Sequence, residues 1–502
     1  MTDLSIHLPA IQVVAPMLLA PLVVLLKPRG LAWMAATAGS IMAFLIALNL
    51  AGQVLAGADV RYVMGGWAEP YGIGLRVDEF SALLLLIVNG ASAAALLAAR
   101  RSIDDAIEGD RQPLFYSAWL LTLAGLCGIV VSADAFNIFV FMEISSLASY
   151  ILVAGGPDRR ALPAVFKYLM MGTIGATFYL IGVGLVYMMT GTLNLADMEL
   201  RIHEVADQRP ILVAAGFITV GLALKAAVFP LHVWLPNAYT YAPHAVTVFL
   251  AACATKVSLY VLLRFDFVVF QQNLVGHELQ FTAFLMPLAA LAILVGSAVA
   301  LFENNLKRLL AYSSVAQIGY ILLGASMISV AGLSAGMLHM FNHALAKGTL
   351  FLAVVCLATR LATFDLREMA GAARAMPWTM AAFVLGGLSL IGVPGTAGFI
   401  SKWYLVTAAL EQGWLGVVLI VVVVAGSLMA VAYIWRIVEA VWFTQPEVGA
   451  AKAETASMAE APLLMLAVTW AAALANIGFG LYTSPQRELA EKAAGALLGQ
   501  LP

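Results

Sequence analysis

Long apolar runs recur along the whole chain, and each is bounded by a short polar or charged stretch. A helix needs about 20 apolar residues to cross the roughly 30 Å of hydrocarbon in a bilayer. About fourteen runs reach that length, so the pattern predicts an all-α integral membrane protein with about fourteen transmembrane helices. The predicted spans cover residues 6–26, 31–55, 78–99, 113–131, 134–154, 163–190, 211–229, 243–265, 280–302, 306–328, 332–358, 377–411, 414–443 and 461–483.

The connections between these runs are short, and we treat residues 1–502 as a single membrane domain. Residues 444–460 read as a polar linker before the last span, and the chain after residue 483 predicts a short amphipathic tail. The first run has no positive charge before it, because its first basic residues are Lys27 and Arg29. It therefore predicts a retained first helix rather than a signal peptide.

Composition supports a membrane protein. Hydrophobic residues make up 63% of the chain and charged residues only 11%, which lies far outside the range of soluble domains. The net charge of −2 and the absence of a basic patch give no indication of nucleic-acid binding.

The basic residues in the loops predict the orientation. If the N-terminus lies outside, thirteen loop lysines and arginines fall on the inner face and six on the outer face. This excess predicts that both termini lie on the outer face. The inner set is Lys27, Arg29, Arg100, Arg101, Arg111, Arg159, Arg160, Lys307, Arg308, Arg360, Arg367, Arg374 and Lys452, and the outer set is Arg61, Arg76, Arg201, Arg209, Arg487 and Lys492.

Two predicted spans contain helix breakers. In residues 220–246, "VGLALKAAVFPLHVWLPNAYTYAPHAV", an apolar helix carries Lys225 and is expected to break at Pro230. In residues 390–406, "LIGVPGTAGFISKWYLV", Pro394 precedes Lys402. Breaks at membrane depth are tolerated where the freed backbone groups are buried in protein or line a wet cavity, and paired broken helices mark ion sites in transporters.

Three cations recur at a fixed spacing. Lys167, Lys225 and Lys256 are followed 180, 177 and 180 residues later by Lys347, Lys402 and Arg436. The offset spans five helices, an odd number, and so predicts two inverted five-helix repeats. These repeats are residues 113–265, spans four to eight, and residues 280–443, spans nine to thirteen, with broken helices seven and twelve.

Several charges lie deep in apolar runs. A charge at the centre of a span costs about 2.5–3.5 kcal/mol on insertion scales, so repeated examples indicate a function. Glu143, Lys225, Lys256 and Lys402 are the strongest candidates, and Lys225 is the natural partner of Glu143. Lys167 and Arg436 lie near span ends, where a surface role is equally compatible with the sequence.

A row of titratable residues lies in "GMLHMFNHALAKGTLFLA". His339, His343 and Lys347 are spaced at i, i+4 and i+8, which places them on one helix face about 6 Å apart along the axis. Such a row suits a proton relay, since histidine titrates near neutral pH. The roles of His232 and His244 stay open between relay and structure.

Cofactor chemistry is not indicated. Cys127, Cys253 and Cys356 lie in separate apolar runs without close partners, and the histidine pair lacks the acidic residue of an HExxH motif. We therefore expect no metal site and no cofactor.

Five motifs in order resemble the proton-conducting antiporter family over about residues 65–440. They are "ALKAAVFPLHVWLPNAYTYAPHAV", "ATKVSLYVLLR", "NNLKRLLAYSSVAQIGYILLG", "FNHALAKGTLFLA" and "GVPGTAGFISKW". The family contains the D subunits of Mrp-type cation/proton antiporters and the antiporter-like subunits of respiratory complex I and membrane-bound hydrogenases. The resemblance implies a fourteen-helix subunit of a bacterial cytoplasmic (inner) membrane complex, with other membrane subunits as partners.

The resemblance also implies roles for particular residues. The proton-path residues of the family fall on Glu143, Lys225, Lys256, His339, His343, Lys347 and Lys402. Asn237 and "APHAV" stand where many members have W-L-P-D and A-P-T-P-V-S, a variant more similar to Mrp D and hydrogenase-type subunits.

The expected function is therefore proton translocation in a multisubunit antiporter that exchanges H⁺ for Na⁺ or another monovalent cation, as a transporter subunit rather than a catalyst on its own. The alternative is a proton-pumping subunit of a complex I-like NADH:quinone oxidoreductase or a membrane-bound hydrogenase, which would make it part of a translocase. A stand-alone solute carrier and a passive structural subunit are rival classes, but neither explains the row of histidines and lysines well.

Overall fold

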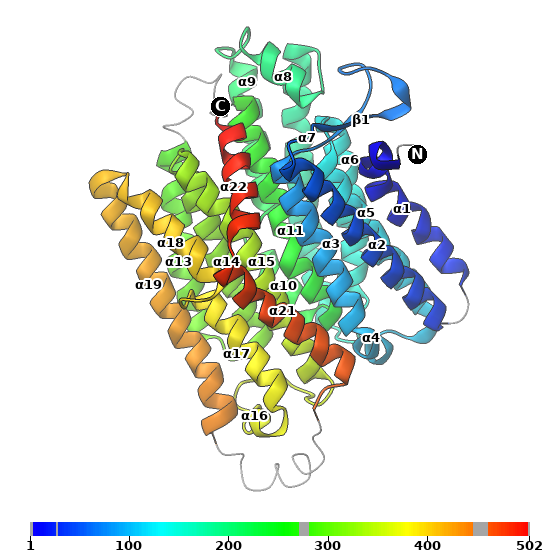
Figure 1. Ribbon diagram of the computed structural model, residues 1–502, viewed down its shortest axis with the longest axis vertical. Coiled ribbons are helices and arrows are strands. Elements are labelled where there is room, and N and C mark those ends of the chain that lie inside the picture. The colour runs from blue at the N-terminus through cyan, green and yellow to red at the C-terminus, as the bar shows by residue number, and fades with distance from the viewer. Residues whose placement is uncertain (1–3, 27–28, 271–280, 445–459, 500–502) are drawn as a thin grey trace.

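The computed structural model describes residues 4–26, 29–270, 281–444 and 460–499, and most of them form helices that run along one common direction (Figure 1). Lys27, Lys452 and most of the predicted linker 444–460 lie outside the described residues. The α-helices are α1 (Leu8–Leu25), α2 (Arg29–Leu55), α3 (Glu79–Ala98), α4 (Arg100–Ala106), α5 (Gln112–Val131), α6 (Ala135–Ala154), α7 (Ala161–Thr190), α8 (Leu195–Ile202), α9 (Arg209–Lys225), α10 (Trp234–Tyr241), α11 (His244–Arg264), α13 (Met286–Phe302), α14 (Leu306–Ala325), α15 (Val330–Ala358), α16 (Ala372–Ala375), α17 (Pro377–Ile391), α18 (Ala397–Leu410), α19 (Gly413–Val438), α21 (Leu463–Leu481) and α22 (Ser484–Leu497). Short 3₁₀ and π-helical pieces are η1 (Leu4–His7), η2 (Met64–Gly66), η3 (Gly109–Arg111), η4 (Phe265–Phe270), η5 (Phe281–Leu285) and η6 (Glu439–Phe443).

The helices account for the predicted spans. Among the described residues, eleven helices are long and apolar enough to cross a membrane. The other three predicted spans correspond to α9, α14 and the broken pair α17 and α18. The protein is an all-α integral membrane protein, as the hydropathy pattern predicts.

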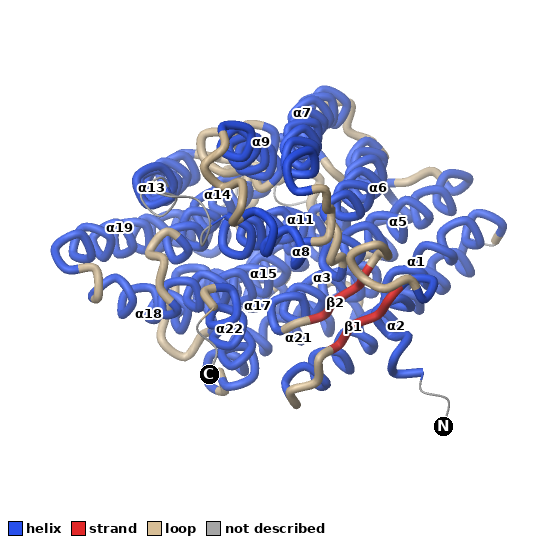
Figure 2. Tube along the Cα trace, turned by 90° about the horizontal axis from the view of Figure 1, so that it is seen from above, coloured by secondary structure: helices blue, strands red, loops and turns tan. Residues whose placement is uncertain are grey.

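The helices differ greatly in burial. Seen along the helix axes, α11 and α15 lie in the middle, with α13, α18 and α19 toward one side and α1 and α2 toward the other (Figure 2). In its most apolar stretch α11 has 89% of its residues buried, whereas α21 has 28%. Polar side chains on α11 and α15 are therefore enclosed by protein rather than by lipid.

A β-hairpin marks one end of the bundle, which we call the hairpin end (Figure 1). Its strands, β1 (Val60–Val63) and β2 (Gly74–Val77), pair antiparallel with Val60 opposite Val77. In the sequence, residues 57–77 are recognisable only as a less hydrophobic stretch, because strands of four residues give too short an alternation to recognise. The helices α4 and α16 lie at the other end, which we call the opposite end.

The first helix break lies earlier than the sequence predicts. We expect a break at Pro230, but α9 ends at Lys225 and α10 begins at Trp234. Ala227 adopts a left-handed backbone conformation with φ of 55°, so the helix cannot continue to the proline. The Trp234 Nε1 atom donates a hydrogen bond of 3.0 Å to the Leu224 carbonyl in the last turn of α9, which also accepts the Ala227 amide at 3.3 Å.

The second break separates α17 from α18. Gly392 ends α17 with φ of 90°, a conformation that favours glycine, and its amide bonds to the Leu388 and Ser389 carbonyls. The helix resumes at Ala397. Both breaks leave backbone carbonyls inside the bundle, where a cation can bind them.

Close packing of α7 and α9 positions the first broken helix. A Cβ atom added to Gly221 would lie 2.5 Å from the Gly175 carbonyl oxygen, and one added to Gly175 would lie 2.7 Å from the Gly221 oxygen. The two backbones therefore touch directly, which only glycine permits. This contact holds Lys225, one turn beyond Gly221, inside the protein.

The predicted tail forms α22, which packs against α3 and α15. Its apolar side, including Leu489, Ala493 and Leu497, is buried, whereas Arg487, Glu488 and Glu491 are exposed. The amphipathic pattern is present, and α22 runs along the bundle in the half that contains the hairpin end (Figure 1).

Candidate functional site

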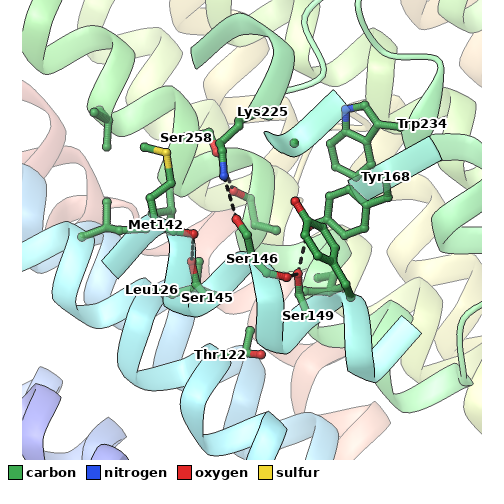
Figure 3. A pocket seen from close by; sticks show the side chains of 17 residues that line it. Thr122, Leu126, Met142, Ser145, Ser146, Ser149, Tyr168, Lys225, Trp234 and Ser258 are labelled. Carbon is green, nitrogen blue, oxygen red and sulfur yellow. Dashed lines mark hydrogen bonds between the residues drawn. The ribbon is translucent and has the colours of Figure 1, made fainter. Parts of the chain in front are cut away.

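The broken end of α9 presents Lys225 to α6. Lys225 Nζ lies 3.8 Å from Glu143 Oε1 and donates a hydrogen bond of 2.7 Å to Ser146 Oγ, the bond drawn in Figure 3. The Lys225 side chain is 6% exposed and that of Glu143 is 29% exposed. The structure thus brings together the two charges that the sequence pairs.

A small cavity adjoins Lys225 (Figure 3). Its volume of about 40 Å³ is enough for water, and hydroxyl groups form much of its polar wall. A proton can pass between hydroxyl groups and an amine in such a space. The hydroxyl groups of the wall that Figure 3 labels belong to Thr122, Ser145, Ser146, Ser149, Tyr168 and Ser258.

Lys256 lies on the central helix α11 and is fully buried. Its Nζ donates a hydrogen bond to the carbonyl of Ala251. Ala254, Val257 and Ser258, from the same turns of α11, form one wall of the Lys225 cavity. Because α11 also packs against α15, it stands between the Lys225 cavity and the residues of α15.

The predicted row lies on one face of α15, and its three side chains are at most 2% exposed. The rings of His339 and His343 are nearly parallel, with centroids 6.2 Å apart. Lys347 Nζ donates to the Leu310 carbonyl at 2.6 Å and to Ser313 Oγ on α14. Within the described residues, neither ring nitrogen of His343 has a hydrogen-bond partner, so both are available for proton exchange with its neighbours.

His339 connects this row to α18. Its Nε2 lies 2.8 Å from Gln317 Oε1 and its Nδ1 lies 2.9 Å from Ser401 Oγ. Ser401 directly precedes Lys402 in the chain. The row on α15 therefore ends beside the second broken helix.

Lys402 occupies the carbonyl end of α17. Its Nζ donates to the carbonyls of Leu390 at 3.0 Å and Ile391 at 2.9 Å, and to Ser427 Oγ at 3.1 Å. The ammonium group also lies 4.7 Å from the centre of the Tyr320 ring. These carbonyls are free because the helix stops at Ile391, and the negative end of the helix dipole stabilises a cation there.

The spacing of the cations differs from the spacing of the helices that the two predicted repeats would pair. If the two predicted repeats correspond helix by helix, paired helices begin 163 to 174 residues apart, from α10 and α18 at 234 and 397 to α5 and α13 at 112 and 286. The cations are 177 to 180 residues apart. Lys225 accordingly ends the segment before its break, whereas Lys402 follows its break as the sixth residue of α18. That the two halves are inverted repeats stays a prediction.

Lys167 and Arg436 do not join the central residues. Lys167 is exposed on α7. Arg436 donates to the Glu303 carbonyl at 3.4 Å and to Asn304 Oδ1 at 3.0 Å, and so binds the loop that follows α13. Its contacts indicate a structural role at the C-terminal end of that helix.

The two remaining histidines lie among aromatic side chains. His232 stacks on Phe229 with ring centroids 5.3 Å apart, and the His244 ring lies 5.1 Å from that of Phe364. In the part of the chain that is described, Nδ1 of each ring has no hydrogen-bond partner. Their roles stay open.

Sequence reasoning missed two features of this region. Ser146 holds Lys225, and its place one turn after Glu143 in "MEISSLASY" could have indicated it. Lys307 is expected in an inner loop, yet it is buried and its Nζ donates to the Ala242 carbonyl at 2.8 Å. Lys307 is the second residue of α14, at the opposite end of the bundle. Hydropathy cannot distinguish an exposed loop lysine from a buried lysine at such a helix end.

The cysteines take no part in this arrangement. Cys127, Cys253 and Cys356 are free and buried. Nowhere in the described ranges do three or more His, Cys, Asp or Glu side chains gather as metal ligands would.

Known proteins are similar to this chain over most of its length. A family model described as "NADH:quinone oxidoreductase/Mrp antiporter, TM" matches residues 132–429. The N subunit of the NADH-quinone oxidoreductase of Desulforudis audaxviator is 40% identical over 444 residues, which cover 87% of this chain and 86% of that protein. The D subunit of the Na(+)/H(+) antiporter of Bacillus subtilis is 29% identical over 413 residues, 82% of each chain.

A solved structure shows the same architecture. A chain of the Mrp complex from a Dietzia species superposes with a TM-score of 0.89 at 26% identity, covering 99% of this chain and 98% of that one. The likeness therefore extends over the spans outside the family match as well as those inside it.

Proposed function

We propose a function from one premise: the chain belongs to the family of NADH:quinone oxidoreductase and Mrp antiporter membrane subunits. It is an antiporter-like proton-translocating membrane subunit, with relatives divided between the D subunits of Mrp antiporters and the N subunits of complex I. The proposal is that it carries protons as the D-type subunit of a multisubunit antiporter that exchanges H⁺ for Na⁺ or another monovalent cation.

One observation carries the proposal. Titratable side chains from five helices follow one another across the bundle, and from Lys256 to Lys402 each is at most 6% exposed. Charges placed there are costly and are retained in transporters for ion movement. The path consists of Glu143, Lys225, Lys256, Lys347, His343, His339 and Lys402.

The contacts of these lysines allow each ammonium group to give up a proton. Lys225 shares its charge with Glu143, and Lys347 and Lys402 are held by neutral oxygens. When the contact between Glu143 and Lys225 opens, Lys225 loses its counter-charge and gives its proton to the hydroxyl-lined cavity. Between Lys347 and Lys402, His343 and His339 pass a proton by accepting at one ring nitrogen and releasing from the other.

The position of Glu143 supports a partner subunit. On α6 it lies on the same face as Val140 and Leu147, which are 37% and 55% exposed. A partly exposed carboxylate in an apolar stripe is costly against lipid. We propose that another membrane subunit of the complex covers this face.

The loop charges support an orientation. The described arginines of the predicted inner set, such as Arg100, Arg160 and Arg374, lie in connections at the opposite end. We propose that the opposite end faces the cytoplasm of a bacterial cell, and that the hairpin end, with both termini, faces outward.

A redox-driven complex is the second candidate. It is favoured by the relative at 40% identity, an N subunit of NADH-quinone oxidoreductase. In that case the same path would be coupled to electron transfer in a translocase. Purification of the assembled complex with its partners separates the two, because flavin or iron–sulfur subunits would identify the redox-driven form.

The proposed path is tested in membrane vesicles that contain the assembled complex. Lys225→Met should abolish proton movement driven by the complex. Lys167→Met makes the same substitution at an exposed lysine and should leave proton movement intact. If Lys225→Met assembles and moves protons at the rate of the unchanged protein, the proposed path is wrong.

A further inference from the structure

An ion pair outside the path described above joins α3 to α11 at the hairpin end. Arg264 Nη2 lies 2.5 Å from both carboxylate oxygens of Asp78, and the two side chains are only 14% and 16% exposed. The residues are 186 positions apart in the chain. Asp78 is also the N-cap of α3, where its carboxylate accepts a hydrogen bond from the Ser81 amide. Capping the helix does not require Arg264.

Two hydroxyl groups lie next to this pair on its inner side. Ser81 Oγ donates to Asp78 Oδ1 at 3.1 Å and lies 3.0 Å from Tyr260 Oη. Tyr260 is buried, and its hydroxyl donates to the Val130 carbonyl at 2.8 Å. If the hydroxyl hydrogen of Tyr260 turns toward Ser81, the three side chains form a continuous hydrogen-bonded chain that ends at Asp78.

The inner end of this chain points back to a residue of the proton path. Lys256, Tyr260 and Arg264 are spaced at i, i+4 and i+8 on α11, so they share one face and rise about 6 Å per step. The Lys256 ammonium now binds the Ala251 carbonyl, on the side away from Tyr260. Its long, flexible side chain can turn toward the hairpin end.

On its outer side the pair borders two polar cavities. Their volumes are about 70 and 140 Å³, room for several water molecules, and Arg76, Glu199 and Arg264 line both. Ala493 and Leu497 of α22 form part of the wall of the larger one. Asp78 lines the larger cavity, Tyr260 lines the smaller one and Arg264 lines both, so the guanidinium group lies where the hydroxyl chain meets the cavities.

We propose that Asp78 and Arg264 form a gate between Lys256 and the hairpin-end surface, with Tyr260 and Ser81 as the proton relay that leads to it. This inference rests on the proposed function, because Lys256 supplies the proton. The guanidinium group is a fixed positive charge in the route and repels cations, whereas Asp78 offsets that charge and accepts the proton. The gate would let the first half of the bundle exchange protons with the hairpin end without using Lys402.

The transfer conserves protons at each step. Lys256, turned toward Tyr260, gives a proton to Tyr260 Oη while Tyr260 gives its own to Ser81 Oγ and Ser81 gives its own to Asp78 Oδ1. Lys256 is then a neutral amine, Asp78 is a neutral acid whose bond to Arg264 is weakened, and both hydroxyl groups keep one hydrogen. Asp78 next releases its proton to water in the larger cavity, which it lines, and the ion pair forms again.

Tyr260→Phe tests the relay with little change in packing, since the ring and its contact with Phe80 remain. Tyr179→Phe is the matched control, because Tyr179 is equally buried and its hydroxyl donates only to the Ala135 carbonyl at 2.9 Å. In vesicles of the assembled complex, Tyr260→Phe should slow driven proton flux by about tenfold or more, and the control should not. Equal flux in both variants, measured per assembled complex, would overturn the relay.

Arg264→Gln tests the gate by a property that a structural role would not change. Without the fixed charge, passive proton leak should rise several-fold in vesicles that lack both substrate cation and reductant, whereas Asp78→Asn should reduce leak and driven flux together. If both variants only lower the amount of assembled complex, and flux and leak per complex are unchanged, the pair is structural and the gate is refuted.

Lys225→Met in the same assay separates the two proposals. If it stops driven flux while the Tyr260 and Arg264 variants behave as the unchanged protein, only the gate fails. If Lys225→Met has no effect either, the proposed function fails with it.

Discussion

Replacing Glu143 by Gln removes one charge of the pair at the first broken helix and keeps the size of the side chain. Across the observed 3.8 Å, two unit charges attract by about 4 kcal/mol at an effective dielectric constant of about 20. Water screens part of this, since Glu143 is 29% exposed, and contacting pairs couple by about 0.5–3 kcal/mol in practice. We therefore expect a coupling of about 1–3 kcal/mol between Glu143 and Lys225.

The assay is a double-mutant cycle on the purified, assembled complex, with denaturant resistance and driven proton flux measured for Glu143→Gln, Lys225→Met and both together. Each single change leaves the other group without its partner, so each should lower stability, and the double variant should lose less than the sum of the two. Flux should be lost in all three variants. A coupling near zero, or flux that survives in the double variant, would refute the view that Glu143 stabilises the charged form of Lys225 during proton transport.

Three further changes test other parts of the structure. Lys402→Met removes the cation from the carbonyl end of α17 and should abolish driven flux in vesicles while the complex still assembles; normal flux would exclude Lys402 from the path. Gly398→Ala would place a Cβ 1.8 Å from the Ser389 carbonyl oxygen and should prevent assembly, whereas Gly216→Ala, with nothing within 4 Å, should assemble normally in the same purification. Arg436→Ala should lower the free energy of unfolding of the complex by about 1–2 kcal/mol and leave flux per complex unchanged. A loss of flux without a loss of stability would contradict the structural role of Arg436.

The helices and the central charges could be predicted from the sequence because both depend on local physics. A run of apolar residues has the length of a span wherever it occurs, and a lysine inside it is costly whatever its partners. This reasoning identified Glu143, Lys225, Lys256 and Lys402, and the helical period placed His339 and His343 on one face.

Partners distant in the chain could not be predicted in this way. The contact between Asp78 and Arg264 depends on how α3 packs against α11, and neither residue lies in the centre of a run. The site of the first helix break depends on the backbone of Ala227 rather than on the proline that follows.

Proton flux through Lys256 tests the central claim most directly, since this fully buried lysine lies on α11, between the Lys225 cavity and the row on α15. The measurement compares Lys256→Met with the surface variant Lys167→Met in vesicles that hold equal amounts of assembled complex. We expect that Lys256→Met stops driven proton flux and that Lys167→Met does not. Full flux in the assembled Lys256→Met complex would contradict the proposal that protons cross the bundle along the path from Glu143 to Lys402.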